Sequence, residues 1–401
     1  MKNQRVLIIG ALVVLAVAAF FFSQKQTEVS DIKVGIILGF TGPIESLTPD
    51  MASGAELAFN EATESGELLG GANIIPIRAD STCVDSAAAS TAAEDLIAQG
   101  IVAIMGADCS GVTGAIATNV AVPNGVVMVS PSATSPGLTD LDDNGLFFRT
   151  APSDARGGEV LAAITKDNGV SSVAITYVNT DYGVGLADVY KASLEANGIT
   201  VTTVTAHEGD KADYSAEVGV LSSAGGDALA VLGYLDQGGN QIIQGSLDSG
   251  AFDTFVLSDG MIGDSLTDTF GSDLDNSFGS MPGSLGEGAQ MFTKYAEENG
   301  VNPSVYVGES YDAAALIILA IQAGESTDKS SIAANIMNVA NGPGEKIMAG
   351  ELSKGLKLLA DGKSIDYQGA TDVSFTDVGE AFGLFIEKGI ENGKFVNVSQ
   401  R

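Results

Sequence analysis

The stretch KVGIILG, residues 33–39, is a short and largely apolar run with several β-branched residues. Runs of this length and composition are typical of a strand that is buried on both faces of a parallel sheet. A turn containing Gly42 and Pro43 follows, and the alanine-rich residues 51–64 then predict a helix. A buried strand followed by a helix is the repeating unit of a doubly wound α/β fold.

The same unit recurs along the chain. Further strands are expected at residues 73–79, 101–106 and 125–130, with helices at 86–99 and 111–121. A second series begins after residues 149–152, with strands expected at 172–178, 200–205, 228–233 and 254–258 and helices at 157–168, 185–197, 215–223 and 239–249. Two such series predict an α/β protein made of two doubly wound parallel-sheet lobes with a cleft between them.

The charge of the chain argues against nucleic acid as a partner. The 401 residues include 51 acidic and 19 basic side chains, for a formal net charge of −32. A surface of this sign repels phosphate backbones, so a nucleic-acid-binding protein is disfavoured.

Sequence signals for catalysis or for a cofactor are weak. No GxxxxGKS/T or GxGxxG motif follows an expected strand, which leaves nucleotide binding without support. The single histidine, His207, stands in a polar stretch beside Glu208 and is expected to be a solvated surface residue. No GxSxG motif is present, and one histidine with two cysteines does not suggest a metal centre. We therefore expect no enzyme, no cofactor and no metal site.

The N-terminus has the pattern of an export signal. Lys2 and Arg5 precede an apolar run over residues 6–22, and small residues at 16–18 offer a cleavage site. The run is almost long enough to span a bilayer, so residues 1–30 are either a signal peptide or an uncleaved N-terminal anchor. Both alternatives predict that the rest of the chain works outside the cytoplasm, in the periplasm or an equivalent space.

The only two cysteines are Cys83 and Cys109. An even number of cysteines in an exported protein suggests a disulfide, and the alternative is two unrelated buried thiols.

Polar residues follow the expected strands of the first series. Ser110 comes directly after the third strand and is expected to cap the next helix, whose free N–H groups favour an anion. Ser132, Ala133 and Thr134 follow the fourth strand and offer hydroxyl and main-chain groups. The alternative is that both stretches are ordinary capping turns. Ligands bind beyond the carboxyl ends of strands in open α/β sheets, so a ligand site here is the more specific hypothesis.

The second series contributes residues of a different kind. Tyr182, Tyr234 and Asp259 each follow an expected strand. The tyrosines suit an apolar wall and the aspartate suits a cation, although each has an ordinary structural alternative as a packing or turn residue. Carboxylate receptors on one lobe and an ammonium receptor on the other match the two charges of an amino acid.

At this point the chain resembles the type 1 periplasmic solute-binding proteins of ABC transporters, in the branched-chain amino acid (leucine/isoleucine/valine) branch. The resemblance spans about residues 32–398. It is carried by the order and spacing of KVGIILGFTGP (33–43), GAELAFNEA (54–62), VSPSATSPGLT (129–139), TDYGVGLA (180–187), ESYDAAALIILA (309–320) and DYQG (366–369).

The resemblance implies roles for the candidate residues. Ser110 and Thr134, with nearby backbone amides such as that of Ala133, would bind the ligand carboxylate. The Ser132 carbonyl and Asp259 would hold the ammonium group, and Tyr182 and Tyr234 would close over the ligand. Leu47 stands where many members have an aromatic residue that lines the side-chain pocket, and it fits an aliphatic or an aromatic ligand side chain. Cys83 and Cys109 match a disulfide found in part of the family.

The resemblance also implies an architecture and partners. Residues 31–150 with about 278–365 would form the first lobe, and 151–277 with about 366–401 the second, joined by a hinge that the chain crosses several times. The protein would be a monomer that delivers its amino acid to an ABC permease in the membrane. Alternatives are a sensor subunit of the same fold, or a binder of an amide or another small carboxylate.

Overall fold

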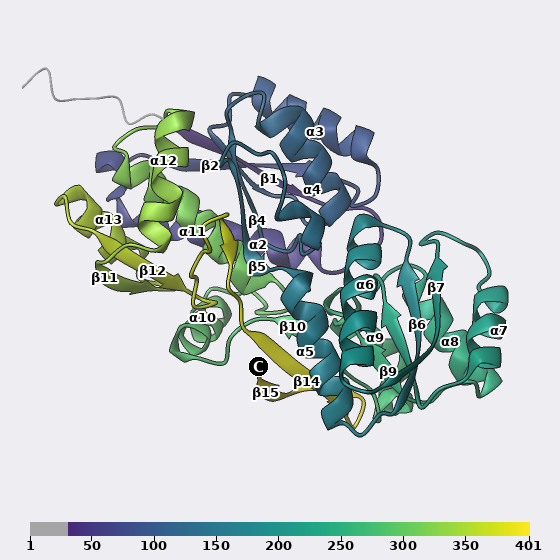
Figure 1. Cartoon of the computed structure of the whole chain (residues 1–401). Coiled ribbons are helices and arrows are strands. Elements are labelled where there is room, and N and C mark those ends of the chain that lie inside the picture. The colour runs from purple at the N-terminus through teal and green to yellow at the C-terminus, as the bar shows by residue number, and fades with distance from the viewer. Residues whose placement is uncertain (1–30) are drawn as a thin grey trace, which may run out of the picture.

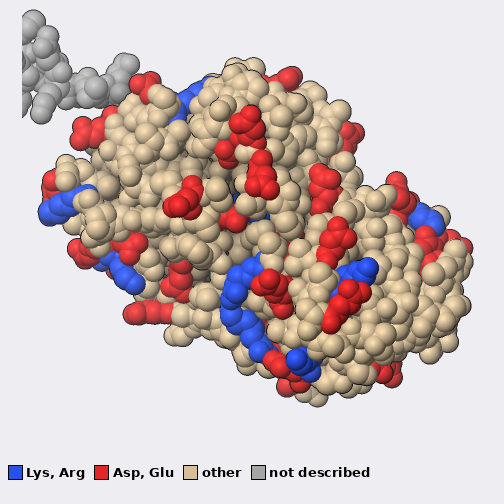
Figure 2. All heavy atoms as spheres, viewed as in Figure 1, with Lys and Arg blue, Asp and Glu red and all other residues tan. Residues whose placement is uncertain are grey.

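The computed structural model describes residues 31–401, which form two α/β lobes side by side (Figure 1). The predicted export signal, residues 1–30, lies outside the described residues. Within the described range, none of the helices has the length and apolar character needed to span a membrane. Acidic side chains are scattered over the visible face of both lobes (Figure 2), in keeping with the negative charge of the sequence.

The first lobe is built on a six-stranded sheet in the order β13-β5-β4-β3-β1-β2. All of its neighbouring strands run parallel. Val34, Ile36 and Ile37 of β1 are fully buried, as expected for a strand with both faces covered. The strands of this sheet are β1 (Ile32–Leu38), β2 (Ile74–Asp80), β3 (Ala103–Gly106), β4 (Val127–Ser130), β5 (Phe147–Pro152) and β13 (Glu380–Ala381).

Helices from two distant parts of the chain cover this sheet. One of them, α11 (Val307–Ala323), is mostly apolar and is buried on almost all sides, against α2 (Thr48–Ser65) and the sheet. A Cβ atom at Gly54 of α2 would lie 2.6 Å from the carbonyl oxygen of Val307, so glycine permits this close helix contact. The other elements of the lobe are η1 (Leu68–Gly70), α3 (Ser86–Ala98), α4 (Ser110–Ile116), η2 (Ala117–Ala121), η3 (Pro136–Leu138), α10 (Glu287–Glu298), α12 (Lys329–Ala340), α13 (Leu352–Ala360) and a two-stranded sheet of β11 (Glu345–Met348) and β12 (Ile365–Gly369).

The second lobe is built on a seven-stranded sheet in the order β15-β14-β10-β9-β8-β6-β7. Strands β6 to β10 pair in parallel, whereas β14 and β15 add an antiparallel hairpin at one edge. The strands are β6 (Ser172–Val178), β7 (Thr200–His207), β8 (Ala228–Leu232), β9 (Phe255–Leu257), β10 (Phe278–Pro282), β14 (Phe385–Glu391) and β15 (Lys394–Gln400). The helices are α5 (Asp154–Asp167), α6 (Asp181–Ala196), α7 (Ser215–Ala224), α8 (Gly239–Ser249), η4 (Asp259–Met261), α9 (Asp264–Phe270) and η5 (Gly271–Leu274).

The predicted fold class, two doubly wound α/β lobes, is confirmed. The chain passes between the lobes after β5, after β10 and between β12 and β14 (Figure 1). Two details differ from the expected division. Strand β10 belongs to the second sheet because it pairs with β9 and β14, so the return to the first lobe follows Pro282 instead of starting at about residue 278. The short strand β13 lies within the expected second-lobe tail, yet it pairs with β5 of the first sheet.

Candidate functional site

A small cavity of about 30 Å³ lies where the two lobes meet. The carboxyl ends of parallel strands from both sheets point toward it, which is where ligands bind in open α/β folds. Six of the predicted site residues line this cavity, three from each lobe: Leu47, Ser110, Ser132, Tyr182, Tyr234 and Asp259. Ile44, Met51, Asp108, Cys109, Gly260 and Tyr306 complete the lining.

Asp259 is the buried acid of the second-lobe wall. It follows β9 at the first position of η4, and only 7% of its surface is exposed. The Tyr182 hydroxyl donates to Asp259 Oδ1 at 2.5 Å, and the Tyr306 hydroxyl donates to Oδ2 from the other lobe. Burial raises the pKa of Asp259, while the two tyrosine hydrogen bonds oppose that rise. The carboxylate is therefore fixed in place by one tyrosine from each lobe.

The tyrosines form an aromatic wall beside this acid. Tyr182 and Tyr234 stack with their ring centroids 5.2 Å apart and their planes inclined by 19°. Burial, together with the nearby Asp259, raises the pKa of the Tyr182 hydroxyl well above its ordinary value. The hydroxyl therefore stays protonated and acts as a donor.

Asp154 is a second buried acid that the sequence interpretation missed. It is the first residue of α5, directly after the crossing from β5, and 3% of its surface is exposed. A small neighbouring cavity touches both Asp154 and Asp259. Burial raises the pKa of Asp154 well above its ordinary value, and the charge of Asp259 raises it further. Two acids this close favour a cation between them, because it would relieve their mutual repulsion.

The first-lobe wall carries hydroxyl and main-chain groups. Cys109, not Ser110, occupies the N-cap of α4, and Ser110 is the first residue of that helix. The Ser110 hydroxyl accepts from the Ser135 amide at 3.0 Å, and the Ser132 hydroxyl donates to the Asp108 carbonyl at 3.1 Å. These bonds hold the loop after β4 against the start of α4.

Thr134 and Ala133 are buried in that same loop but do not line the cavity itself. The Ala133 carbonyl accepts from the guanidinium of the buried Arg149 at 3.1 Å. The Thr134 carbonyl accepts from the Asp154 amide at 2.8 Å, whereas the Thr134 hydroxyl has no hydrogen-bond partner within residues 31–401. An unpaired buried hydroxyl is uncommon in folded proteins.

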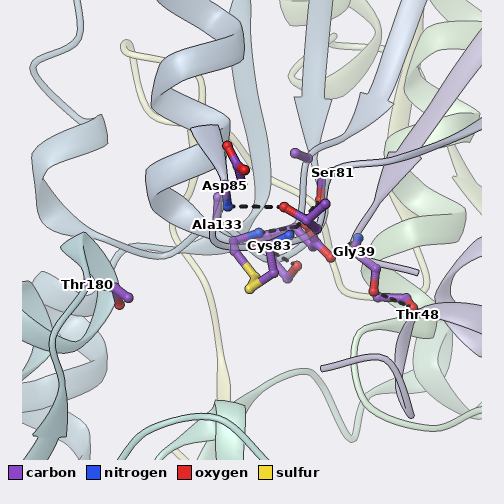
Figure 3. The surroundings of a disulfide bond; sticks show 12 residues. Gly39, Thr48, Ser81, Cys83, Asp85, Ala133 and Thr180 are labelled. Carbon is purple, nitrogen blue, oxygen red and sulfur yellow. Dashed lines mark hydrogen bonds between the residues drawn. A yellow bond between two sulfur atoms is a disulfide. The ribbon is translucent and has the colours of Figure 1, made fainter. Parts of the chain in front are cut away.

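The predicted disulfide is confirmed. Cys83 and Cys109 are joined with their Cα atoms 5.1 Å apart, and Gly39 and Ser81 lie next to Cys83 (Figure 3). The neighbouring Asp108 carboxylate accepts from the Gly39 amide at 2.6 Å and from the Ser81 hydroxyl at 3.0 Å. The disulfide and Asp108 together tie the ends of β1, β2 and β3 beneath the first-lobe wall.

His207 corrects one expectation, because it is buried instead of solvated. It ends β7, only 2% of its surface is exposed, and its Nδ1 lies 2.8 Å from the Thr176 hydroxyl. Burial lowers the pKa of His207 to about 4, so the ring is neutral at physiological pH. In the part of the chain that the structure describes, no group of three or more His, Cys, Asp or Glu side chains is arranged to hold a metal ion.

Two α/β lobes with a small cavity at their junction, lined by both apolar and polar side chains, define the class of two-lobed solute-binding proteins. The family model of the periplasmic binding proteins matches residues 31–348, and the chain belongs to that family. The family places its members outside the cytoplasm, in agreement with the predicted export signal.

Relatives of similar sequence are named as leucine/isoleucine/valine-binding proteins. The chain is 29% identical over 310 residues to Leu/Ile/Val-binding protein homolog 1 of Brucella melitensis, a match that covers 76% of this chain and 81% of the relative. It is 34% identical over 214 residues to the Leu/Ile/Val-binding protein BraC3 of Rhizobium johnstonii, which covers 52% and 56% of the two chains.

Solved structures show the same fold. The leucine-binding protein LivK of Thermotoga maritima matches with a TM-score of 0.76 at 23% identity, covering 92% of this chain and 98% of that one. LivJ of Streptococcus pneumoniae, solved with isoleucine, matches with a TM-score of 0.76 at 20% identity and covers 92% and 99%. A solute-binding protein of R. palustris, solved with benzoate, matches with a TM-score of 0.73 at 16% identity and covers 92% and 96%.

Proposed function

We propose that this chain is the extracytoplasmic binding component of an ABC importer and that it captures an aliphatic amino acid by closing its two lobes. The observation that carries the proposal is the buried Asp259 carboxylate of the second lobe, which faces hydroxyl groups of the first lobe across one enclosed cavity. An amino acid carries both a cation and an anion, and these two walls offer a receptor for each.

The ammonium group would lie against the acids. Asp259 keeps acceptor capacity beyond its two tyrosine bonds, and Asp154 has a buried carboxylate oxygen without a hydrogen-bond partner among the described residues. The Ser132 carbonyl would take the third N–H of the ammonium group. A positive charge at this place stabilises both carboxylates in their ionised form.

The carboxylate would lie against the first lobe. Ser110 begins α4, where free backbone N–H groups favour an anion, and Thr134 has an unpaired hydroxyl behind it. The predicted amide of Ala133 is not free for this role, because it already donates to the Ser130 hydroxyl at 3.0 Å. Neutral donors of this kind hold a carboxylate by hydrogen bonds without introducing a buried positive charge.

The remaining wall matches an aliphatic side chain in its chemistry. Ile44, Leu47 and Met51 line the cavity from the first lobe, and each is at most 6% exposed. Burying an aliphatic side chain against them contributes about 1.5–3 kcal/mol. The names of the relatives from Brucella and Rhizobium support a branched-chain ligand.

Lobe closure would follow from the chain crossings. We take the lobes to rotate about the segments after β5, after β10 and before β14, as in the hinge motions of other two-lobed binders. The closed protein, a monomer, would be recognised by a membrane permease. We propose binding without chemical change and without a cofactor, since the acids and tyrosines of the cavity are held by one another and the neutral His207 lies outside its lining.

The test is titration calorimetry with L-leucine, L-isoleucine and L-valine, with leucinamide and benzoate as matched probes. Leucinamide lacks the carboxylate and benzoate lacks the ammonium group, so each removes one of the two charges. We expect the amino acids to bind at one site per chain and both probes to bind at least about 100-fold more weakly, since stranding a buried charge costs several kcal/mol. Tighter binding of benzoate than of leucine would refute the amino acid assignment.

A further inference from the structure

Among the hydrogen bonds that join the lobes outside the cavity, two belong to Asp236. The Asp236 amide donates to the Pro43 carbonyl at 3.0 Å. The Ser46 amide donates to Asp236 Oδ2 at 2.9 Å. Asp236 follows β8 of the second lobe, whereas Pro43 and Ser46 belong to the turn after β1 of the first lobe. A single residue of the second lobe thus binds the loop after β1 through two hydrogen bonds.

This loop also contains two of the residues that are proposed to contact the ligand side chain. Ile44 lies between the two hydrogen-bonded positions, and Leu47 follows directly after them. Both side chains line the cavity and are 6% exposed. Asp236, Pro43 and Ser46 do not line it. The bonds therefore act on the cavity only through the loop they hold.

The same second-lobe segment also carries a wall residue. Tyr234, which stacks on Tyr182, is only two residues before Asp236. The side chain of Leu47 also reaches the second lobe, since its Cδ2 atom would lie 3.1 Å from a Cβ atom at Gly263. The Asp236 hydrogen bonds and the Leu47–Gly263 contact thus hold the apolar residues of the first lobe next to the aromatic residues of the second.

We infer that Asp236 is a positioning residue, which fixes Ile44 and Leu47 over the ligand side chain when the lobes close. This inference rests on the proposed function. Because its two bonds span the lobes, they are made on closure and must break before a ligand leaves. Loss of the carboxylate removes a charge-assisted bond and should act on ligand release, not on ligand entry. It should also loosen the wall that distinguishes leucine from larger side chains.

The experiment compares Asp236→Ala with Asp253→Ala in the full chain. Asp253 is an exposed aspartate of the same lobe that bonds only to its neighbour Thr254, so it controls for the lost charge. Release of radiolabelled L-leucine is timed after an excess of unlabelled leucine is added. We expect release to be about tenfold faster in Asp236→Ala, the loss that one such bond of ~1.4 kcal/mol corresponds to. Asp253→Ala should match the wild type.

Three further readouts separate positioning from a general structural role. Asp236→Asn keeps an acceptor oxygen and should release leucine at an intermediate rate. The preference for leucine over phenylalanine should shrink in Asp236→Ala. The unfolding temperature of the ligand-free Asp236→Ala protein should equal that of Asp253→Ala. Equal release rates for the two alanine variants, or a lower unfolding temperature for Asp236→Ala alone, would overturn the inference.

Failure of the proposed function would be seen separately, as a wild-type protein that binds no leucine. When leucine does bind, hydrogen exchange at the Ser46 amide of the leucine-saturated protein tests the contact directly, because the bond is made on closure. Exchange faster in Asp236→Ala than in Asp253→Ala supports the contact between the lobes, and equal exchange contradicts it.

Discussion

The two walls of the cavity are made of different chemistry. Apart from Asp108, whose carboxylate is bound by Gly39 and Ser81, the first-lobe wall offers neutral hydroxyl and main-chain groups, on strand ends tied together by the Cys83–Cys109 disulfide. The second-lobe wall offers the buried acid Asp259, which one tyrosine from each lobe positions, with Asp154 in the neighbouring small cavity. A neutral receptor can be removed at the cost of one hydrogen bond, whereas removal of the acid strands a buried charge of the ligand. Ligand affinity should therefore fall further when the acid of the second lobe is removed than when a neutral group of the first lobe is removed.

Asp259→Ala gives the largest expected effect. Without this carboxylate the ligand ammonium loses its main counter-charge inside the closed cavity, which costs about 3–5 kcal/mol. Titration calorimetry should show Kd for leucine rising at least about 100-fold. Asp253→Ala, which removes an exposed acid of the same lobe, should leave Kd unchanged. An unaltered Kd in Asp259→Ala would contradict the proposal that the acidic wall contributes more to affinity than the first-lobe wall.

Removal of the disulfide tests the support of the first-lobe wall. The bridge joins residues 26 positions apart, and closing a loop of that length stabilises the fold by about 3.5 kcal/mol in the chain-entropy model. The double variant Cys83→Ala, Cys109→Ala should lose about this much unfolding free energy in urea titrations. Non-reducing peptide mapping of the wild type should find the two cysteines linked, and two free thiols would contradict the pairing.

Thr134→Val tests a single neutral receptor. Its hydroxyl has no hydrogen-bond partner among the residues described, so valine should leave the unfolding temperature of the ligand-free protein nearly unchanged. Leucine binding should weaken by about 1–3 kcal/mol through the lost hydrogen bond. Thr113 of α4 also has an unpaired, buried hydroxyl but does not line the cavity, so Thr113→Val is the matched control and should bind normally. Equal affinities in the two variants would argue against a role for Thr134.

The pH dependence of binding gives the smallest effect. The pKa values of Asp259 and Asp154 are both raised in the protein without ligand, and a bound ammonium group would lower them. Binding should therefore release protons, and affinity should increase as pH rises above the ordinary aspartate range. We expect a change of about threefold between roughly pH 6 and 8. Asp154→Asn should flatten this profile, while affinity that falls with rising pH would contradict the assignment.

Many of the cavity residues could be predicted from the sequence, because ligand-binding residues of α/β folds follow the carboxyl ends of the strands. Ser110, Ser132, Tyr182, Tyr234 and Asp259 all follow strands, and parallel strands present their carboxyl ends at the same edge. Asp154 obeys the same rule after β5, but residues 147–152 are not among the expected strands, so the rule gives no candidate there. Tyr306 obeys no such rule.

Tyr306 reaches the site only through packing. It precedes α11 with a left-handed backbone (φ 62°), and α11 itself is placed by its contact with α2, far away in the sequence. The burial of His207 was missed for a related reason. Its neighbours in sequence are polar, but Gly233 and Gly238 from a distant loop pack against its ring.

The sequence by itself determined the α/β class and the two series of strands and helices, and it suggested the pairing of the two cysteines, because periodicity and cysteine number are local or countable properties. Tertiary structure alone decided that β10 belongs to the second sheet, that β13 joins the first, and that Tyr306 and Asp259 meet. These outcomes depend on which of several similar edges a strand or helix packs against. That choice is set by contacts between residues far apart in the chain, which no local pattern encodes.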